Sequence, residues 1–492
     1  MNVQIKNKFY FGVLILIFLL GFFLRAKGLL SNPSMWHDES ALAWNVKFKS
    51  YFDLLCAHLR FLQIAPPLFM VFAKLMTWLF GVTNTVGEFD FVVRLIPFLF
   101  SILSVFVFYF ILKDVFNMKK TIIFAMFLFA INNVLVNYSF EFKPYCSDMF
   151  FVMLVLLIFL KIDFLKINLK KILLISMILS SFVWFSFVSL FAIGAGLIYL
   201  IFKKTDFKRI SVLFLPFLLN FLLYSKIYLL GAYINNKNGM VTFWADKFIS
   251  ADFSNFIYLF SQNITYFFIP LKSALFIVIL ALYGIFIFVK EKRFNFVIMA
   301  LLIFSLSVAS SILHIYPFSQ RLIIFFIPLI IIFISKPLDQ ISLSKKVKSI
   351  MILMLLFFIT FPQIKKTSES FTSVKINKGH FGKEMMQYLA QNIKPDDIIL
   401  FNSGSNADFY YYSSFYNLKN KFIQEKVNED KDEAYLKFLQ GLKKGNYWFF
   451  MPYDYTSERR VTNCFMNWAY KNQKVLSKAE STRSVLMYVK IR

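Results

Sequence analysis

The sequence RLIPFLFSILSVFVFYFILK occupies residues 94–113, and only its first and last residues are charged. A helix of about twenty apolar residues is roughly 30 Å long, which matches the hydrocarbon core of a lipid bilayer. A basic cluster at 113–120 follows it directly. Apolar runs of this kind recur through the first three quarters of the chain, so we expect an integral membrane protein with many spanning helices.

The composition of the whole chain supports this class. Of its 492 residues, 59% are hydrophobic and 16% are charged, and the mean hydropathy is +0.63. The formal net charge of +27 could indicate nucleic-acid binding, but membrane proteins collect Lys and Arg in cytoplasmic loops for topological reasons. Because no known nucleic-acid-reading motif appears, we expect no nucleic-acid partner.

The basic clusters at the ends of the apolar runs predict the topology. Placing Lys6, Lys8 and every later cluster in the cytoplasm satisfies the positive-inside rule at each step. These later clusters lie at 113–120, 161–171, 203–209, 290–293 and 336–348. About eleven spanning helices follow from this placement, at 9–24, 94–113, 121–138, 149–161, 171–185, 188–202, 210–229, 271–289, 294–311, 320–335 and 349–363.

An odd number of spans predicts a cytoplasmic N-terminus and an extracytoplasmic C-terminal part. The first apolar run resembles a signal peptide, but no small-residue cleavage site follows it, so we expect a retained first helix. The predicted outer segments are 25–93, 139–148, 230–270 and 314–320. The first of them contains two helix-like stretches, 40–62 and 67–80, and the second stretch is expected to lie at the membrane interface.

The last part of the chain, 364–492, is polar and rich in Tyr and Lys. A helical pattern at 381–393 precedes a buried-type strand at 398–401, and the same order recurs at 432–442 and 447–451. The predicted fold is therefore a polytopic α-helical membrane domain, 1–363, followed by a small extracytoplasmic α/β domain, 364–492. The three cysteines, Cys56, Cys146 and Cys464, form no CxxC pair and indicate neither a disulfide framework nor a zinc site.

Acidic residues are nearly missing from the predicted spans but occur at their outer ends. Transporters usually place ionisable groups at mid-membrane, whereas an enzyme acting on a lipid head group needs them at the interface. The first such group is WHDES, residues 36–40, in which the adjacent Asp38 and Glu39 must point in different directions. One can act as a base or metal ligand while the other orients it. The structural alternative is a helix N-terminus whose acidic residues meet the helix dipole.

Two further groups lie at outer ends. YSFEFKPYCSD, residues 138–148, offers Glu141, Lys143, Tyr145 and Asp148, with Lys143 suited to neutralise a phosphate; an interfacial belt of Tyr and snorkelling Lys is the alternative. HIYPFSQR, residues 314–321, ends in Arg321, which lies on the side where the positive-inside rule would not place it. Arg94 shows the same anomaly, so a phosphate partner is expected for both arginines, with His314 nearby as a further substrate-binding candidate.

The order of five motifs resembles one family of membrane enzymes. WHDES, APPLF (65–69), RLIPFLFS (94–101), YSFEFKPY and YPFSQR are similar to motifs of the GT-C membrane glycosyltransferases, the superfamily of protein mannosyltransferases and aminoarabinose transferases, and within it to bacterial family-39-like members. The resemblance covers roughly residues 9–335. It implies that Asp38 is the catalytic base, that Glu39 supports it or a divalent metal ion, that Glu141 is the second-loop acid and that Arg321 lies near the donor phosphate. Lys143 departs from the family, which usually has Arg there.

The resemblance also implies a reaction. The protein is expected to transfer a sugar from a polyprenyl-phosphate donor, with inversion, to a lipid, glycan or protein acceptor of the cell envelope on the outer side of the membrane. Two other classes remain open on the sequence. A surface-polysaccharide polymerase or flippase would also be polytopic and basic, although a flippase would carry charges within its spans. A non-catalytic receptor would bind a partner through residues 364–492.

Overall fold

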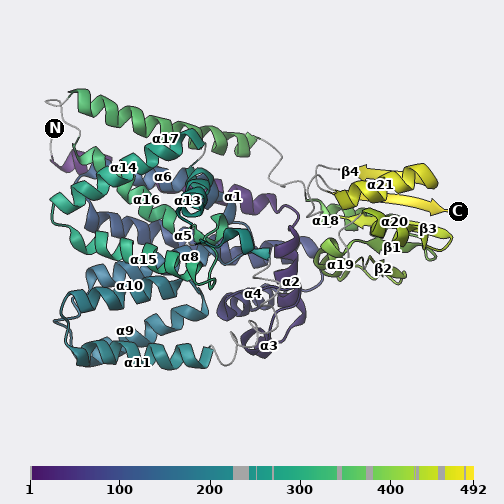
Figure 1. Cartoon of the computed structure of the whole chain (residues 1–492), viewed down its shortest axis with the longest axis horizontal. Coiled ribbons are helices and arrows are strands. Elements are labelled where there is room, and N and C mark those ends of the chain that lie inside the picture. The colour runs from purple at the N-terminus through teal and green to yellow at the C-terminus, as the bar shows by residue number, and fades with distance from the viewer. Residues whose placement is uncertain are drawn as a thin grey trace.

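The structure is a computed structural model that describes residues 3–224, 243–250, 252–268, 271–340, 346–372, 380–425, 427, 432–452, 460–480 and 484–492. Most of these residues are helical. Figure 1 shows the long helices of the first three quarters of the chain lying side by side, with a small α/β unit at one end of them. The fold is therefore a helical membrane region joined to a small sheet.

Thirteen helices of the described chain build the membrane region. Neighbouring helices that pack along their lengths include α1 with α6, α5 with α8, α9 with α11, α10 with α15 and α14 with α16. Their bounds are α1 (Val3–Ser31), α5 (Val86–Val115), α6 (Lys119–Ile131), α7 (Asn133–Tyr138), α8 (Tyr145–Lys161), α9 (Leu169–Ser181), α10 (Ser189–Phe202), α11 (Phe207–Tyr224), α13 (Phe253–Phe268), α14 (Leu271–Lys290), α15 (Phe294–Ile312), α16 (Phe326–Ser335) and α17 (Lys346–Thr372).

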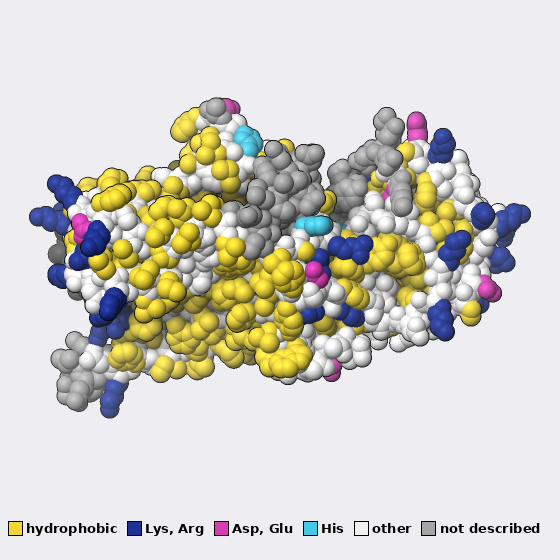
Figure 2. Space-filling model, turned by 90° about the horizontal axis from the view of Figure 1, so that it is seen from below, with side chains coloured by type: hydrophobic (Ala, Val, Ile, Leu, Met, Phe, Trp, Pro, Cys, Tyr) yellow, Lys and Arg dark blue, Asp and Glu magenta, His cyan; other side chains and the backbone are white. Residues whose placement is uncertain are grey.

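Four of these helices are long and apolar enough to cross a membrane by length and composition alone. They lie at Asn7–Ser31, Val86–Val115, Phe207–Tyr224 and Phe294–Ile312. Figure 2 shows hydrophobic side chains covering the helical part of one face, with Lys and Arg side chains at the end away from the α/β unit. A helix covers at least part of each predicted span, but the count of eleven spans stays a prediction. Residues 225–229 of a predicted span, and residues 230–242, 251, 269 and 270 of the predicted outer segment 230–270, lie outside the described part of the chain.

The basic loops meet at one end of the helices. Asp114 pairs with Lys161, and its backbone carbonyl accepts a hydrogen bond from Arg293 at 2.6 Å. Lys336 lies 2.6 Å from the Glu291 carboxylate. The clusters that the topology places on one side of the membrane therefore do share one end of the protein. That this end faces the cytoplasm stays a prediction.

Several predicted helix bounds are wrong in detail. The predicted helix 40–62 is two helices, α2 (His37–Phe48) and α3 (Tyr51–Cys56), because Ser50 caps α3 by accepting a hydrogen bond from the Asp53 amide. The predicted span 121–138 is broken at Asn132, whose side chain caps α7. The predicted span 320–335 begins as a 3-10 turn, η4 (Gln320–Ile323), before α16. The predicted helix 67–80 is present as α4 (Pro67–Leu79), and its place at the membrane interface stays a prediction.

A buried arginine stabilises the break at Asn132. The Arg25 guanidinium is fully buried in α1 and donates to the carbonyls of Phe129 and Ala130 in the last turn of α6. It also donates to the Ser101 hydroxyl on α5 at 2.9 Å. A cation at a helix C-terminus satisfies carbonyls that the helix itself leaves unpaired. Arg25 therefore ties α1, α5 and α6 together through the end of α6.

The C-terminal unit is a five-stranded mixed sheet with helices. The strand order is β2-β1-β3-β5-β4, in which β1 pairs in parallel with β2 and β3, and β5 pairs antiparallel with β3 and β4. Both predicted helix-then-strand units are present. The element bounds are α18 (Gly382–Asn392), β1 (Ile398–Phe401), α19 (Asn406–Ser413), β2 (Phe422–Gln424), α20 (Asp432–Gln440), β3 (Gly445–Met451), α21 (Arg460–Asn472), β4 (Lys474–Glu480) and β5 (Val485–Ile491).

The α/β unit shares a hydrophobic core with the first outer loop. One cluster of buried side chains joins Leu42, Phe69 and Val93 to Met386 and Tyr411. Helix α17 runs across position 363, and the α/β unit begins with α18. The proposed division into two domains at 363 stays a prediction, and the two parts are not packed independently of each other.

Candidate active site

Helix α2 begins with the WHDES motif and directs its two carboxylates apart. Asp38 and Glu39 occupy the first turn of the helix, where the unpaired backbone amides favour negative charge. The Asp38 carboxylate is about 20% exposed, whereas that of Glu39 is 3% exposed. The predicted divergence of the two side chains is confirmed, and each has a different set of partners.

Asp38 lies between two cations from distant parts of the chain. Its carboxylate is 3.2 Å from an Arg321 guanidinium nitrogen and 3.6 Å from the Lys143 ammonium. The Gln63 side chain supports the same group, since its oxygen accepts a hydrogen bond from Lys143 at 2.8 Å and its amide interacts with Asp38. The three predicted residues Asp38, Lys143 and Arg321 therefore form one cluster, and Gln63 is a member that the sequence patterns did not identify.

Two tryptophans flank this cluster. The Arg321 guanidinium lies 4.8 Å from the ring centre of Trp36 and 5.2 Å from that of Trp244. The Lys143 ammonium is 5.8 Å from the Trp36 ring. Aromatic faces attract cations and orient a planar guanidinium. The rings therefore hold the two cations in place beside Asp38.

The electrostatic balance keeps Asp38 ionised. Burial raises the pKa of Asp38, but the positive charges of Lys143 and Arg321 outweigh this effect and hold the pKa below its usual value. Burial lowers the pKa of Lys143, and the Asp38 charge opposes that shift. Asp38 is therefore a carboxylate at neutral pH, and its basicity depends on how strongly the two cations are engaged with it.

Glu39 serves a different set of contacts. Its two oxygens accept hydrogen bonds from Arg94 at 3.0 and 3.1 Å, and one of them also accepts from the backbone amide of Phe142 at 2.6 Å. Arg94 further donates to the Pro33 carbonyl at 2.6 Å. Glu39 thus links α2, α5 and the second outer loop.

Arg94 is buried and paired with Glu39. The side chain is 1% exposed and committed to Glu39 and to the chain that precedes α2. The outward position that suggested a phosphate partner is explained by Glu39, which supplies the negative charge 55 residues earlier in the sequence. In the structure Arg94 holds the start of α2, and a role in binding a phosphate stays a prediction.

The second outer loop brings its polar residues to the same region. Glu141 is buried, and its charge acts on both Lys143 and Arg321. Tyr145 packs edge-on against Tyr138, whose hydroxyl is 2.7 Å from that of Tyr266. Asp148 is buried one turn further along α8, and one of its oxygens has no hydrogen-bond partner among the described residues. Glu141, Lys143 and Tyr145 therefore lie around Asp38 and Arg321, and Asp148 neighbours Tyr145.

His314 is not brought into the cluster. It is exposed, its Nδ1 lies 3.1 Å from the Ile312 carbonyl, and its ring packs against Phe248. The described contacts of His314 do not include Asp38, Lys143 or Arg321. A role in substrate binding for His314 stays a prediction without structural support.

The C-terminal unit contributes the contact that sequence patterns did not predict. Asp408, in α19, lies 3.2 Å from Nδ1 of His37, and its other oxygen accepts a hydrogen bond from Ser40 at 2.7 Å. The Tyr412 hydroxyl accepts a hydrogen bond from the Met35 amide at 2.7 Å. The segment that carries Asp38 is thus held from both sides by α19.

The residues do not fit a divalent metal ion at Asp38 and Glu39. The Glu39 oxygens are occupied by Arg94 and a backbone amide, and the Asp38 carboxylate faces two further cations. A metal ion would have to displace positive side chains from both carboxylates. Among the described residues, no group of three or more His, Cys, Asp and Glu side chains could hold a metal.

Comparison with known proteins finds chains of similar structure but no match by sequence. No protein-family model and no curated protein matches the chain. The apo structure of ArnT from Cupriavidus metallidurans is similar over 97% of this chain and 98% of that one, with a TM-score of 0.57 and 13% identity. ArnT from the same organism bound to undecaprenyl phosphate is similar over 99% and 98%, with a TM-score of 0.56 and 12% identity.

A second enzyme shares the architecture over a shorter range. The apo oligosaccharyltransferase of Archaeoglobus fulgidus is similar over 84% of this chain and 60% of that one, with a TM-score of 0.52 and 15% identity. At such identities the likeness concerns the fold. The chain therefore has the same fold as ArnT and the archaeal oligosaccharyltransferase.

Proposed function

We propose that the protein is an inverting glycosyltransferase that moves a sugar from a polyprenyl-phosphate donor to an acceptor on the extracytoplasmic side of the membrane. The observation that carries this proposal is the Asp38 carboxylate, partly exposed and 3.2 and 3.6 Å from Arg321 and Lys143. A base beside two cations fits a reaction in which a hydroxyl loses a proton while a phosphate leaves. ArnT, which shares the fold, has been solved with undecaprenyl phosphate bound.

The donor phosphate is proposed to bind to Lys143 and Arg321. Arg321 can present two parallel N–H groups to a phosphate, and the two tryptophans hold its guanidinium in plane. Lys143 supplies a compact positive charge. In the structure both cations are engaged with Asp38, so a phosphate between them would take over part of their hydrogen bonding.

That exchange would activate Asp38. A phosphodiester anion beside Lys143 and Arg321 neutralises charge that now holds the pKa of Asp38 down. With the cations turned to the phosphate, the carboxylate becomes more basic and free to accept a proton. Donor binding would thereby prepare the base for the acceptor.

The transfer step needs only the donor, the acceptor hydroxyl and the Asp38 carboxylate. The acceptor hydroxyl gives its proton to Asp38, its oxygen forms a bond to the anomeric carbon, and the bond from that carbon to the phosphate oxygen breaks. The bonding electrons leave with the polyprenyl phosphate, whose added charge is stabilised by Lys143 and Arg321. Attack opposite to the leaving phosphate inverts the anomeric configuration.

A donor assay tests the proposal. The purified protein in lipid nanodiscs would receive a panel of radiolabelled polyprenyl-phosphate sugars, with hydrolysis or transfer to a cell-envelope extract as the signal. We expect turnover with at least one donor and a loss on the order of 10²- to 10⁴-fold in Asp38→Asn. The control is Glu88→Gln, an exposed carboxylate at the start of α5. An Asp38→Asn variant that inserts normally and works as fast as wild type would exclude Asp38 as the base.

The same assay distinguishes a glycosyltransferase from the two alternative classes of protein, a polysaccharide polymerase or flippase and a non-catalytic receptor. A polymerase, a flippase or a non-catalytic receptor would give neither hydrolysis nor transfer with any single-sugar donor. Deletion of 364–492 is unsuitable as a test for the receptor, because the α/β unit shares a buried core with Leu42 and Phe69 of the first outer loop. Point variants of the full-length chain are therefore preferable.

A further inference from the structure

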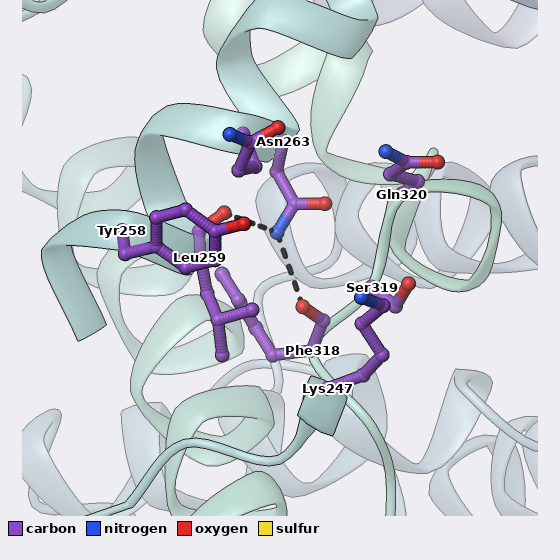
Figure 3. A pocket seen from close by; sticks show the side chains of 8 residues that line it. Lys247, Tyr258, Leu259, Asn263, Phe318, Ser319 and Gln320 are labelled. Atoms are coloured by element: carbon purple, nitrogen blue, oxygen red, sulfur yellow. Dashed lines mark hydrogen bonds between the residues drawn. The ribbon is translucent and has the colours of Figure 1, made fainter. Parts of the chain in front are cut away.

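A polar pocket lies next to Arg321, between helix α13 and the chain that enters η4 (Figure 3). The pocket is open on one side, and the volume within it that water can reach is about 50 Å³, which is enough for a few water molecules or for a few hydroxyl groups of a larger ligand. Ser319 and Gln320 in its wall directly precede Arg321 in the sequence. The polar side chains that line it are those of Lys247, Tyr258, Gln262, Asn263, Ser319 and Gln320.

Asn263 offers an unused acceptor in this pocket. Its side-chain nitrogen donates to the carbonyls of Leu259 at 2.8 Å and Phe318 at 3.1 Å. These two acceptors fix the orientation of the amide, because a flipped amide would turn its oxygen toward two carbonyl oxygens. The amide oxygen has no hydrogen-bond partner among the described residues, although the side chain is only 3% exposed.

The direction of this oxygen points to a ligand. Figure 3 shows it on the Gln320 side of Asn263, away from the two hydrogen bonds that the nitrogen makes. A buried acceptor that stays unpaired is unfavourable, so a donor group from a ligand or from water is expected there. The hydroxyl of a bound molecule would satisfy it.

The polar side chains that line the pocket suit a neutral ligand rich in hydroxyl groups. The Lys247 ammonium lies 2.5 Å from the Asp246 carboxylate, so its charge is already balanced. The remaining polar groups are amides and hydroxyls, which donate and accept at short range without net charge. The ring of Tyr258 is 57% exposed and offers an apolar face for C–H groups.

We propose that this pocket is a sugar subsite that receives hydroxyl groups from one edge of a single sugar ring. The ring would come from the donor or from the acceptor, and both sources present the same chemistry to Asn263 and Gln320. Its place in the reaction rests on the proposed glycosyl transfer, since Arg321 joins the pocket wall to Asp38 at 3.2 Å. Binding of a sugar to the pocket does not depend on that reaction.

Binding of simple sugars tests the pocket without turnover. Saturation-transfer NMR would be recorded on the full-length protein in lipid nanodiscs, which avoid alkyl-glycoside detergents, with the methyl glycosides of glucose, galactose, mannose and N-acetylglucosamine as probes. At least one probe should bind, and the double variant Gln262→Leu/Gln320→Leu should weaken its binding on the order of ten-fold. Gln387→Leu, an exposed amide of α18, is the matched control and should bind as wild type does.

Competition identifies the source of the sugar. If a polyprenyl-phosphate sugar displaces the bound glycoside, the pocket holds the donor sugar, and the double variant should also raise the donor KM in hydrolysis without acceptor. If the donor does not displace it, the pocket holds the acceptor, and donor hydrolysis should be unchanged.

Two results would overturn the subsite: no glycoside binds to the wild type, or the double variant binds as tightly as the wild type. If the wild type binds a glycoside but turns over no donor, the proposed function is contradicted and the pocket assignment remains intact.

Discussion

The carboxylate of Asp408, in the C-terminal α/β unit, lies 3.2 Å from Nδ1 of His37, the residue directly before Asp38. The same carboxylate accepts a hydrogen bond from Ser40, two residues after Asp38. One acidic side chain therefore contacts side chains on both sides of the proposed base. This contact gives the α/β unit a part in the active site, because rigid support of a catalytic group is needed to keep it in reacting geometry.

The first prediction concerns the pH dependence of stability. Burial lowers the pKa of His37, but the hydrogen bond and charge of Asp408 outweigh it, so the pKa is raised above its usual value of 6.5. The pair then stabilises the fold fully below pH 6.5, and this stabilisation is lost as the pH rises through the higher pKa of the folded state. Asp408→Asn should cost roughly 1.5–3 kcal/mol at pH 6 and less at pH 9.

Thermal unfolding of the variant and wild type in nanodiscs at the two pH values measures this difference. Asp396→Asn, an exposed carboxylate in the same α/β unit, is the control and should have no pH-dependent effect. A loss in Asp408→Asn that is equal at pH 6 and pH 9 would show that the charge of His37 takes no part in the contact.

Local patterns were enough to predict the helices and part of the site. Apolar runs and basic clusters follow directly from the bilayer, so the helical class and the shared basic end could be read from the sequence. Asp38, Lys143 and Arg321 could be grouped because the predicted topology places each of them at an outer helix end, on the same side of the membrane. The helix break at Asn132 had a local signal, since Asn is a common N-cap residue.

The remaining contacts depend on packing between distant segments. Asp408 is 371 residues from His37 in the sequence, and its helix α19 carries no motif that points to the membrane region. Arg94 was assigned to a phosphate because its position contradicted the positive-inside rule, but a buried partner, Glu39, explains it equally well.

The second prediction concerns Lys143 and the acid limb of activity. Its ammonium contributes to the low pKa of Asp38, so Lys143→Met should raise that pKa. Because the base must be ionised, the fall of kcat/KM at low pH should then begin at higher pH than in the wild type. Loss of one charged phosphate contact should also raise the donor KM about 10- to 100-fold.

A pH series of donor hydrolysis gives both quantities. Lys419→Met, which removes an exposed lysine of the α/β unit, should leave the profile unchanged. If the acid limb in Lys143→Met stays at the wild-type pH while KM rises, Lys143 binds the phosphate without influencing the base.

The third prediction concerns the buried pair of Glu39 and Arg94. Arg94→Leu leaves the Glu39 carboxylate buried without a cation, with backbone amides such as those of Phe142 and Trp36 as its partners, so the unfolding free energy should fall by about 3–5 kcal/mol. The double variant Glu39→Leu/Arg94→Leu removes both charges and should be more stable than Arg94→Leu alone. Thermal unfolding of the two variants compares them directly.

The exposed pair of Lys365 and Glu369 is a suitable control for this comparison. Both side chains are more than 60% exposed and 4.0 Å apart, so Lys365→Leu should change stability little. A double variant no more stable than the single one would mean that Arg94 acts through its hydrogen bond to the Pro33 carbonyl rather than through Glu39.

The last prediction concerns the close approach of α14 to α16 at Gly284. A Cβ atom on Gly284, in α14, would lie 1.9 Å from the backbone oxygen of Phe333 in α16. Backbone atoms cannot rotate away, so Gly284→Ala must separate the two helices and should cost about 1–3 kcal/mol or more. Gly12→Ala in α1 meets no atom within 4 Å and should be neutral or slightly stabilising, because Ala favours helix over Gly. Fluorescence-detected size-exclusion melts of both variants test this, and equal melting temperatures would show that α14 and α16 do not pack this closely in the membrane.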